Sequence, residues 1–130
     1  MAKILIIEDE ANIIDILSLI MQTAGHETIA AFGGEEGLQL AQEKLPDLIL
    51  LDLMMPNVDG YEVIDRLKEN SQTSSIPVIV ITALIPYKPS EKLKLSKSNI
   101  ADYVVKPFDT AVLVEKINKA LERARRKKNG

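Results

Sequence analysis

The chain has 130 residues, of which 46% are hydrophobic and 27% are charged, as expected for one soluble globular domain with a single core. It contains no cysteine, which excludes disulfides and thiolate metal sites, and no apolar run approaches the roughly 20 residues that span a bilayer. The opening residues, MAKILIIEDE, lack the long apolar segment of a signal peptide, so we expect a cytoplasmic protein without membrane contacts.

The charge is unevenly distributed along the chain. The net charge is −3, but residues 123–130, RARRKKNG, carry five basic residues and no acidic one, which leaves −8 on residues 1–122. We therefore predict one domain over 1–122 and a basic C-terminal tail or linker stub over 123–130. The acidic body argues against nucleic-acid binding by this domain. The tail could contact an anionic partner, but a solvated helix end is the commoner interpretation.

Strands and helices are predicted to alternate along the chain. Short runs rich in Ile, Leu and Val are typical of strands buried on both faces of a parallel sheet. In chain order, the predicted strands are ILII at 4–7, ETIAA at 27–31, LILL at 48–51, VIVI at 78–81 and YVV at 103–105, and the predicted helices are 11–24, 35–44, 60–70, 90–98 and 110–126. This alternation predicts an α/β fold, a doubly wound parallel sheet of (βα)5 type.

The first predicted helix has more apolar residues than one buried face requires. We assign Ile13, Ile16, Leu17, Ile20 and Ala24 to the core face, with Gly25 ending the helix. Three further apolar residues remain: Ile14, Leu19 and Met21. They indicate either a broad core contact or a surface on which helices of a partner dock.

Polar side chains follow four of the five predicted strands. Glu8, Asp9 and Glu10 follow the first strand, and Asp52 follows the third. In open α/β sheets, ligands bind beyond the carboxyl ends of the strands, where the strand order reverses. If the order is 2-1-3-4-5, the first and third strands are neighbours at about 4.8 Å. Glu8, Asp9 and Asp52 then crowd together and raise one another's pKa, a conflict that Mg²⁺ with oxygen ligands removes.

The fourth and fifth strands add the remaining groups of this predicted site. Thr82 follows the fourth strand and offers a hydroxyl donor, and Lys106 follows the fifth and offers an ammonium group. A carboxylate beside a metal, a lysine and a hydroxyl is a good phosphoryl acceptor. We therefore expect Asp52 to lie unburied at the mouth of its strand as a nucleophile. Each residue alone is common at a strand end or helix cap, and only the combination is informative.

Four segments together resemble the receiver domain of two-component response regulators, the chemotaxis-Y-like fold. ILIIEDE is similar to the family's acidic-pair strand, and PDLILLDLMMPNVDGYEV to its phosphoacceptor segment. PVIVITAL is similar to the switch strand, and ADYVVKPF to the Lys-Pro strand. The resemblance covers essentially the whole chain, and it implies a flavodoxin-like sheet of order 2-1-3-4-5.

The resemblance implies a metal-dependent phosphorylation site. Asp52 accepts the phosphoryl group, Asp9 binds Mg²⁺ (or Mn²⁺) directly, and Glu8 assists, in part through water. The backbone carbonyl of Met54 is a further metal ligand. Lys106 pairs with the acyl phosphate.

The resemblance also implies a switch. Thr82 hydrogen-bonds a phosphoryl oxygen and moves toward it, and Tyr103 is the aromatic residue that turns inward when Thr82 moves. A cis peptide is implied at Lys106-Pro107. The phosphoryl group comes from a sensor histidine kinase or a histidine phosphotransfer protein. Phosphorylation changes partner binding at the face of the fourth helix, fifth strand and fifth helix. The chain departs from the family in IPYKPSEK, which holds two prolines, and in SKSNIAD before the last strand.

Two other function classes are compatible with the fold. One is an enzyme, a phosphohydrolase of the haloacid-dehalogenase type, but such enzymes place a second Asp two residues after the nucleophile, where this chain has Met54. The other is an interaction module that is never phosphorylated, which the intact set of Asp9, Asp52, Thr82 and Lys106 disfavours. We therefore predict a domain that catalyses only its own phosphorylation and dephosphorylation and is not otherwise an enzyme.

Overall fold

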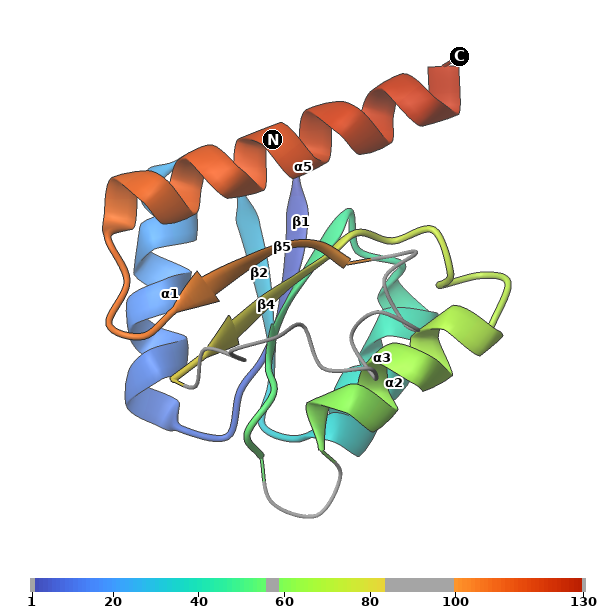
Figure 1. The fold of residues 1–130 in the computed structure, drawn as a ribbon, viewed down its shortest axis with the longest axis horizontal. Coiled ribbons are helices and arrows are strands. Elements are labelled where there is room, and N and C mark those ends of the chain that lie inside the picture. Colours follow the sequence, from blue (N-terminus) through green and yellow to red (C-terminus); the bar gives the residue numbers. More distant parts are fainter. Residues whose placement is uncertain (1, 56–58, 84–99, 130) are drawn as a thin grey trace.

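The computed structural model describes residues 2–55, 59–83 and 100–129 (Figure 1). Five parallel strands form one sheet in the order β2-β1-β3-β4-β5. The strands are β1 Lys3–Ile7, β2 Glu27–Ala31, β3 Leu48–Asp52, β4 Val78–Thr82 and β5 Ile100–Val105, and the helices are α1 Ala11–Thr23, α2 Gly34–Lys44, α3 Gly60–Glu69 and α5 Thr110–Asn129. The predicted doubly wound sheet and its order are confirmed. The helix predicted over 90–98 lies outside the described residues.

The middle of the sheet explains why these segments lack polar alternation. Every residue of β3 and β4 is buried, as is every residue of β1 after Lys3. Strands covered on both faces have no solvent-facing positions, so their sequences run continuously through Ile, Leu and Val. The outer strands β2 and β5 are more exposed and correspondingly less apolar.

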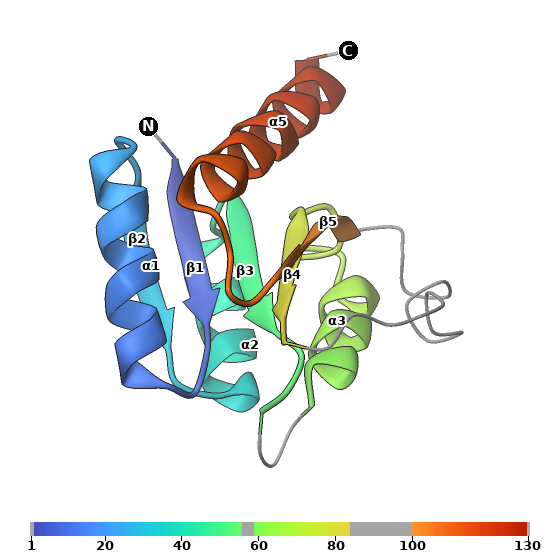
Figure 2. The ribbon, with the colours of Figure 1, turned by 60° about the vertical axis from the view of Figure 1, so that its left-hand side comes forward.

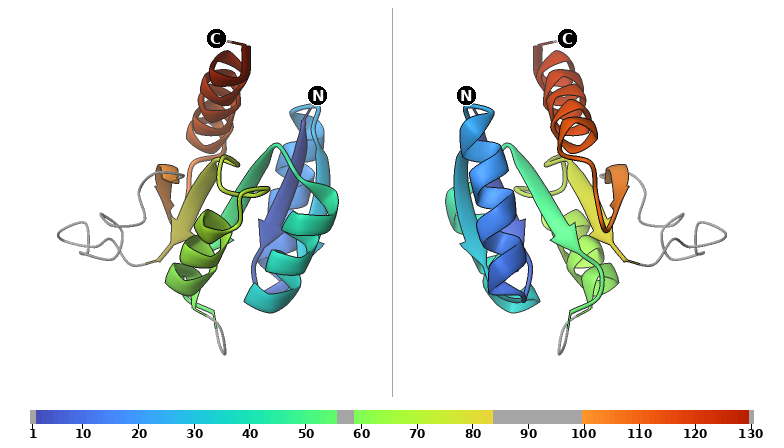
Figure 3. Two further views of the ribbon diagram at one scale, coloured as in Figure 1. Left: turned by 90° about the vertical axis from the view of Figure 1, so that its right-hand side faces the viewer. Right: turned by 90° about the vertical axis from the view of Figure 1, so that its left-hand side faces the viewer.

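Helices cover both faces of the sheet. Helices α2 and α3 pack on one face, where Ala41, Val63, Ile64 and Leu67 meet alternate residues of the strands. Helices α1 and α5 pack on the other face, over the remaining strand residues. The strands lie between the two helix pairs in Figure 2, and Figure 3 shows α2 and α3 in front from one side and α1 in front from the other.

The buried face of α1 differs from the predicted one. Ile14, Leu17 and Met21 are buried, whereas Ile16 is 48% exposed. The helix is therefore rotated from the prediction, and two residues assigned as surplus belong to the core. Leu19 is 67% exposed, as a residue outside the core would be.

Local sequence explains how two helices begin and end. The Asp59 carboxylate caps α3 by accepting a hydrogen bond of 2.9 Å from the backbone N–H of Glu62. Gly25 follows α1 with φ +92°, a left-handed conformation that glycine adopts without steric penalty. The predicted stop at Gly25 is thus confirmed.

The last helix, α5, runs without a break from Thr110 to Asn129. It includes residues 123–129, so the proposed division at 122 falls inside a continuous helix and stays a prediction. The His26 ring lies 3.2 Å from Asn118 Oδ1 through Nε2, and its Nδ1 accepts the Ala2 N–H. This contact ties the turn after α1 to the middle of α5. Within the described ranges, no helix has both the length and the apolar composition needed to cross a membrane.

Candidate functional site

The carboxyl ends of the strands bring the predicted residues to one edge of the sheet, where the arrowheads lie in Figure 2. Asp52 and Thr82 are the last residues of β3 and β4, while Glu8 and Lys106 directly follow β1 and β5. The pairing of Ile7 with Leu51 and of Asp52 with Ile81 holds these ends level. The sheet order thus makes neighbours of residues up to 98 positions apart.

One ammonium group bridges two carboxylates at this edge. Lys106 Nζ lies 3.0 Å from Glu8 Oε2 and 3.4 Å from Asp52 Oδ2. The Glu8 and Asp52 side chains are only 2% and 4% exposed, and the Lys106 side chain is 18% exposed. Buried carboxylates require such compensation, because an unpaired buried charge costs several kcal/mol.

The expectation that Asp52 is unburied is wrong. Asp52 lies at the end of its strand as predicted, but its side chain is enclosed. The carboxylate can remain there because each of its two oxygens has a partner. One oxygen faces Lys106 Nζ, and the other accepts a hydrogen bond of 3.0 Å from the backbone N–H of Met54.

Backbone packing fixes the segment that follows Asp52. The Gly60 N–H donates to the Leu53 carbonyl at 3.1 Å. A Cβ at Gly60 would lie 2.5 Å from Leu53 Cα, so only glycine allows this approach. Glycine at 60 therefore holds the start of α3 against the strand end that carries Asp52.

Burial and charge shift the pKa values of this cluster. Burial, together with hydrogen bonding to Asp52 and the Asp52 charge, raises the pKa of Glu8 to about 7, although Lys106 acts in the opposite direction. Burial alone would lower the pKa of Lys106, but its contacts with the Glu8 and Asp52 carboxylates outweigh this and raise it. Burial is thus the main cause of the Glu8 shift, and a single ammonium group faces the two buried carboxylates.

Three consecutive carboxylates lie together beside this ion cluster. One oxygen each of Glu8, Asp9 and Glu10 can be chosen so that all lie within 4.8 Å of one another. The Glu10 N–H also donates to Glu8 Oε1 at 3.3 Å. Such hard oxygen donors fit Mg²⁺ or Mn²⁺. The sequence prediction assigned no role to Glu10, although its place directly after the acidic pair was a usable signal.

Thr82 and Tyr103 lie on neighbouring strands and on the same face of the sheet. Tyr103 pairs with Val80, and Thr82 pairs with Val105. Residues two apart on a strand share a face, which places Tyr103 with Val80 and Thr82. Thr82 is buried, whereas Tyr103 is 36% exposed. The Lys106-Pro107 peptide is cis, as the family resemblance implied.

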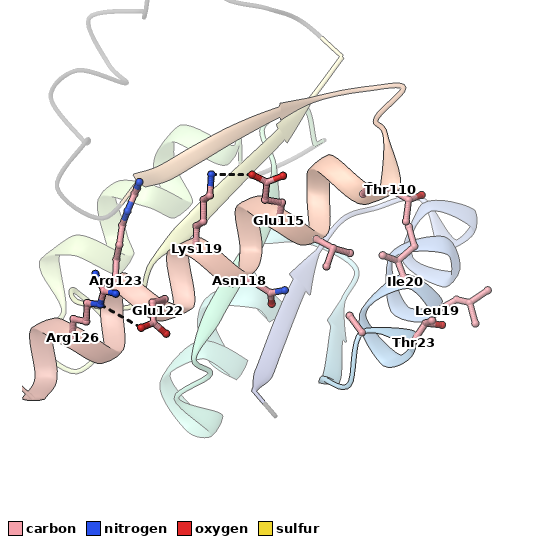
Figure 4. A pocket seen from close by; sticks show the side chains of 13 residues that line it. Leu19, Ile20, Thr23, Thr110, Glu115, Asn118, Lys119, Glu122, Arg123 and Arg126 are labelled. Atoms are coloured by element: carbon pink, nitrogen blue, oxygen red, sulfur yellow. Dashed lines mark ion pairs between the residues drawn. The ribbon is translucent and has the colours of Figure 1, made fainter.

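A groove lined by described residues lies away from this site. It has a volume of about 1110 Å³ and runs between α1 and α5 (Figure 4). Leu19 and Ile20 lie on its α1 side, and two ion pairs, Glu115–Lys119 and Glu122–Arg126, lie along α5. None of the strand-end residues lines it, so the groove and the charged site are separate features.

Comparison with known proteins gives a consistent result. A family model described as the response regulator receiver domain matches residues 4–118. The chain is 39% identical over 126 residues to the DNA-binding dual master transcriptional regulator RpaA of Synechocystis, covering 97% of this chain and 52% of RpaA. It is 32% identical over 121 residues to Protein PilH of Pseudomonas aeruginosa, covering 93% of this chain and 98% of PilH.

Solved structures share the fold. The Vibrio cholerae chemotaxis protein CheY4 superposes with a TM-score of 0.80 at 30% identity, covering 95% of this chain and 98% of that one. The chain thus spans about half the length of the transcriptional regulator RpaA and nearly all of PilH and CheY4.

Proposed function

Because the chain belongs to the family of response regulator receiver domains, we propose that it is a phosphorylation-controlled signalling switch with Asp52 as its phosphoacceptor. The observation that carries this proposal is the contact of Lys106 Nζ with the buried carboxylates of Glu8 and Asp52. A phosphoryl acceptor needs a nucleophilic carboxylate beside a fixed positive charge, and Asp52 lies beside Lys106 in this way.

The transfer converts the Asp52 carboxylate to an acyl phosphate. A carboxylate oxygen forms a bond to the phosphorus of the donor, and the bond between phosphorus and the donor atom breaks, its electron pair remaining with the donor. The product carries more negative charge than the carboxylate, and Lys106 offsets part of it. Thr82 lies buried at the end of β4, where its hydroxyl is suited to donate to a phosphoryl oxygen.

We propose Mg²⁺ or Mn²⁺ as the cofactor. Glu8, Asp9, Asp52 and the backbone carbonyl of Met54 supply the oxygen donors that would hold it. The excess of carboxylates over ammonium groups at this edge supports this assignment, because a divalent cation would offset the remaining negative charge. When bound, the cation supplies positive charge to the phosphoryl oxygens.

Thr82 and Tyr103 are proposed to transmit the phosphorylated state. A charged phosphoryl acceptor draws the Thr82 hydroxyl, since such hydrogen bonds are roughly twice as strong as neutral ones. The space that Thr82 leaves is filled by the Tyr103 ring, which lies on the same face of the sheet and is partly exposed. Thr82→Ala should still accept phosphate at Asp52 but should weaken the response of β5 and α5.

We propose a sensor histidine kinase or a histidine phosphotransfer protein as the donor. The output is binding of a protein partner at the face formed by the predicted fourth helix, β5 and α5. The DNA binding named for RpaA is not carried over, because this chain spans only about half of RpaA. We further propose a cytoplasmic location, and a receiver domain over 1–122 followed by a basic segment over 123–130.

The phosphohydrolase alternative is weaker on chemical grounds. Its general acid would stand at position 54, where the exposed Met54 side chain cannot donate a proton. In the proposed function the chain catalyses only changes at its own Asp52. A separate substrate turned over many times would contradict this.

Phosphorylation of Asp52 can be tested directly. The full chain is incubated with acetyl phosphate and Mg²⁺ and examined on a phosphate-affinity gel and by intact mass. We expect one added phosphoryl group in the parent. It should not form when EDTA is present during the incubation, and it should not form in Asp52→Asn. Asp15→Asn, which changes an exposed Asp of α1, should label like the parent. Labelling of Asp52→Asn, or labelling indifferent to EDTA, would overturn the assignment.

A further inference from the structure

The free edge of β5 is closed at Tyr103 by side chains. Strand β5 ends the described sheet and pairs with β4 through one edge only. The Tyr103 N–H donates to Asp102 Oδ1 at 2.8 Å, and the Tyr103 carbonyl accepts from Lys116 Nζ at 2.8 Å. Both main-chain groups of Tyr103 are therefore bound by side chains, as edge strands need when no strand pairs with them.

Lys116 connects this edge to α5. Its Nζ lies 3.1 Å from Asp102 Oδ1, in addition to its bond to the Tyr103 carbonyl. The side chains of Lys116 and Asp102 are 32% and 39% exposed, so their ion pair alone would contribute little. The pair matters because Asp102 binds the backbone N–H of Tyr103 and Lys116 binds its carbonyl.

The contacts lie on the face opposite the Tyr103 ring. Val104 packs with α1 and α5, and Asp102, two residues earlier, lies on the same side as Lys116 of α5. Tyr103 lies between them in sequence and points to the other face, with Val80 and Thr82. The backbone is thus held from one face of the sheet, while the partly exposed ring lies on the other.

We propose that Lys116 and Asp102 form a latch that positions the Tyr103 backbone, so that the aromatic ring moves about a fixed point coupled to α5. Lys116 is a positioning residue: it acts on the ring through the main chain and does not touch Asp52. The proposal deepens the proposed switch and rests on Tyr103 being its moving part. It adds a physical link from that part to α5, which the Thr82 relay alone does not provide.

The latch is tested by the environment of the ring. The full chain is prepared with 3-fluorotyrosine, and its three tyrosines are assigned in fluorine NMR spectra with the variant Tyr103→Phe. Spectra are recorded without ligand and with beryllofluoride plus Mg²⁺. Lys116→Met removes the ammonium and keeps the aliphatic stem, Lys116→Arg keeps a cationic donor, and Lys119→Met is a matched change on α5 at an ion pair away from β5.

We expect Lys116→Met to shift and broaden the Tyr103 resonance without ligand, and to speed hydrogen exchange of the Tyr103 amide about tenfold, in line with the loss of a charge-assisted contact. Lys116→Arg should restore the parent resonance, and Lys119→Met should leave it unchanged. If Lys116→Met and the parent share the same Tyr103 resonance and amide exchange, the latch is wrong. If beryllofluoride leaves Tyr103 unmoved in the parent, the proposed relay fails, while the ligand-free comparison still decides the latch.

Discussion

Two ion pairs of this molecule have nearly equal lengths and opposite consequences. Lys106–Glu8 spans 3.0 Å at the strand ends, and Lys119–Glu115 spans 2.9 Å on α5. The first pair is almost enclosed, with side chains 18% and 2% exposed, whereas both side chains of the second are 64% exposed. Distance alone does not distinguish them, so burial must decide what each pair does.

The pKa values of the two glutamates show how burial decides. Hydrogen bonding and the nearby charge of Lys119 lower the pKa of Glu115. Burial raises the pKa of Glu8 to about 7 even though Lys106 lies against it. A lysine partner thus stabilises an exposed carboxylate and only partly rescues a buried one, since desolvation penalises the charged form.

Of the substitutions considered, removing the buried lysine should lower the stability of the protein most. Lys106→Met leaves two enclosed carboxylates without their ammonium group. We expect the free energy of unfolding, measured by urea denaturation in EDTA at pH 8, to fall by about 3 kcal/mol. The loss should shrink at acidic pH, where Glu8 takes up a proton. A loss no larger than that of Lys119→Met would show that the cluster is effectively solvated.

The stability of the metal-free protein should fall as pH rises from about 4.5 to about 7. In this range the unfolded chain has released the Glu8 proton while the folded protein, whose Glu8 pKa is about 7, still holds it. Stability from this group is therefore complete below pH 4.5 and lost above 7, by an amount on the order of 1–3 kcal/mol. Glu8→Gln should remove that fall in urea titrations in EDTA.

Glu115 supplies the control of opposite sign. Its lowered pKa contributes stability that is present above its ordinary value of 4.5 and is lost as pH falls through the lower folded value. Glu115→Gln should therefore leave the fall between pH 4.5 and 7 intact. If the two Gln variants give the same pH profile, the assigned origin of the fall is wrong.

Neutralising the phosphoacceptor should stabilise the metal-free protein. Asp52→Asn removes a like charge beside Glu8 and leaves the Lys106–Glu8 contact in place. We expect a gain of about 1 kcal/mol in EDTA, the size of a modest pKa coupling. Added Mg²⁺ should stabilise the parent more than the variant, so the difference should narrow or reverse. A variant that unfolds more easily than the parent in EDTA would contradict the argument from crowded carboxylates.

The smallest effect should come from the exposed pair. Lys119→Met removes an ion pair that water already screens on both sides. Its melting temperature should equal that of the parent within the error of a thermal scan. A clear decrease would indicate that α5 contributes more through surface charge than the burial of its residues suggests.

Much of the fold could be predicted because the strands carry their own signal. Buried parallel strands read as continuous Ile, Leu and Val runs, and the predicted ranges agree with the structure within a few residues. The rotation of α1 could not be predicted in the same way. Ile13, Ile14, Ile16, Leu17 and Leu19 surround that helix with apolar residues, so periodicity does not select one face.

The residues that meet at the strand ends could be predicted better than their burial. Polar residues at strand ends could be found by position, because the fold gathers those ends. The burial of Asp52 could not, because position in the sequence places Lys106 beside Asp52 but does not show how closely the neighbouring segments enclose the carboxylate. The left-handed conformation of Leu45 after α2, at φ 46°, also lacked a signal, since glycine or asparagine usually occupies such positions.

Because α5 is one continuous helix, a small rotation near its middle moves its far end. Twenty helical residues form a rod about 30 Å long, and Figure 1 shows its C-terminal part reaching beyond the sheet. Lys116 and Asn118 anchor the first half of the rod to β5 and to the turn after α1. The far end lies roughly 18 Å along the helix from these anchors, so a tilt of about 6° there would carry it about 2 Å. A displacement too small to matter beside Asp52 would thus be magnified at the basic end of the helix.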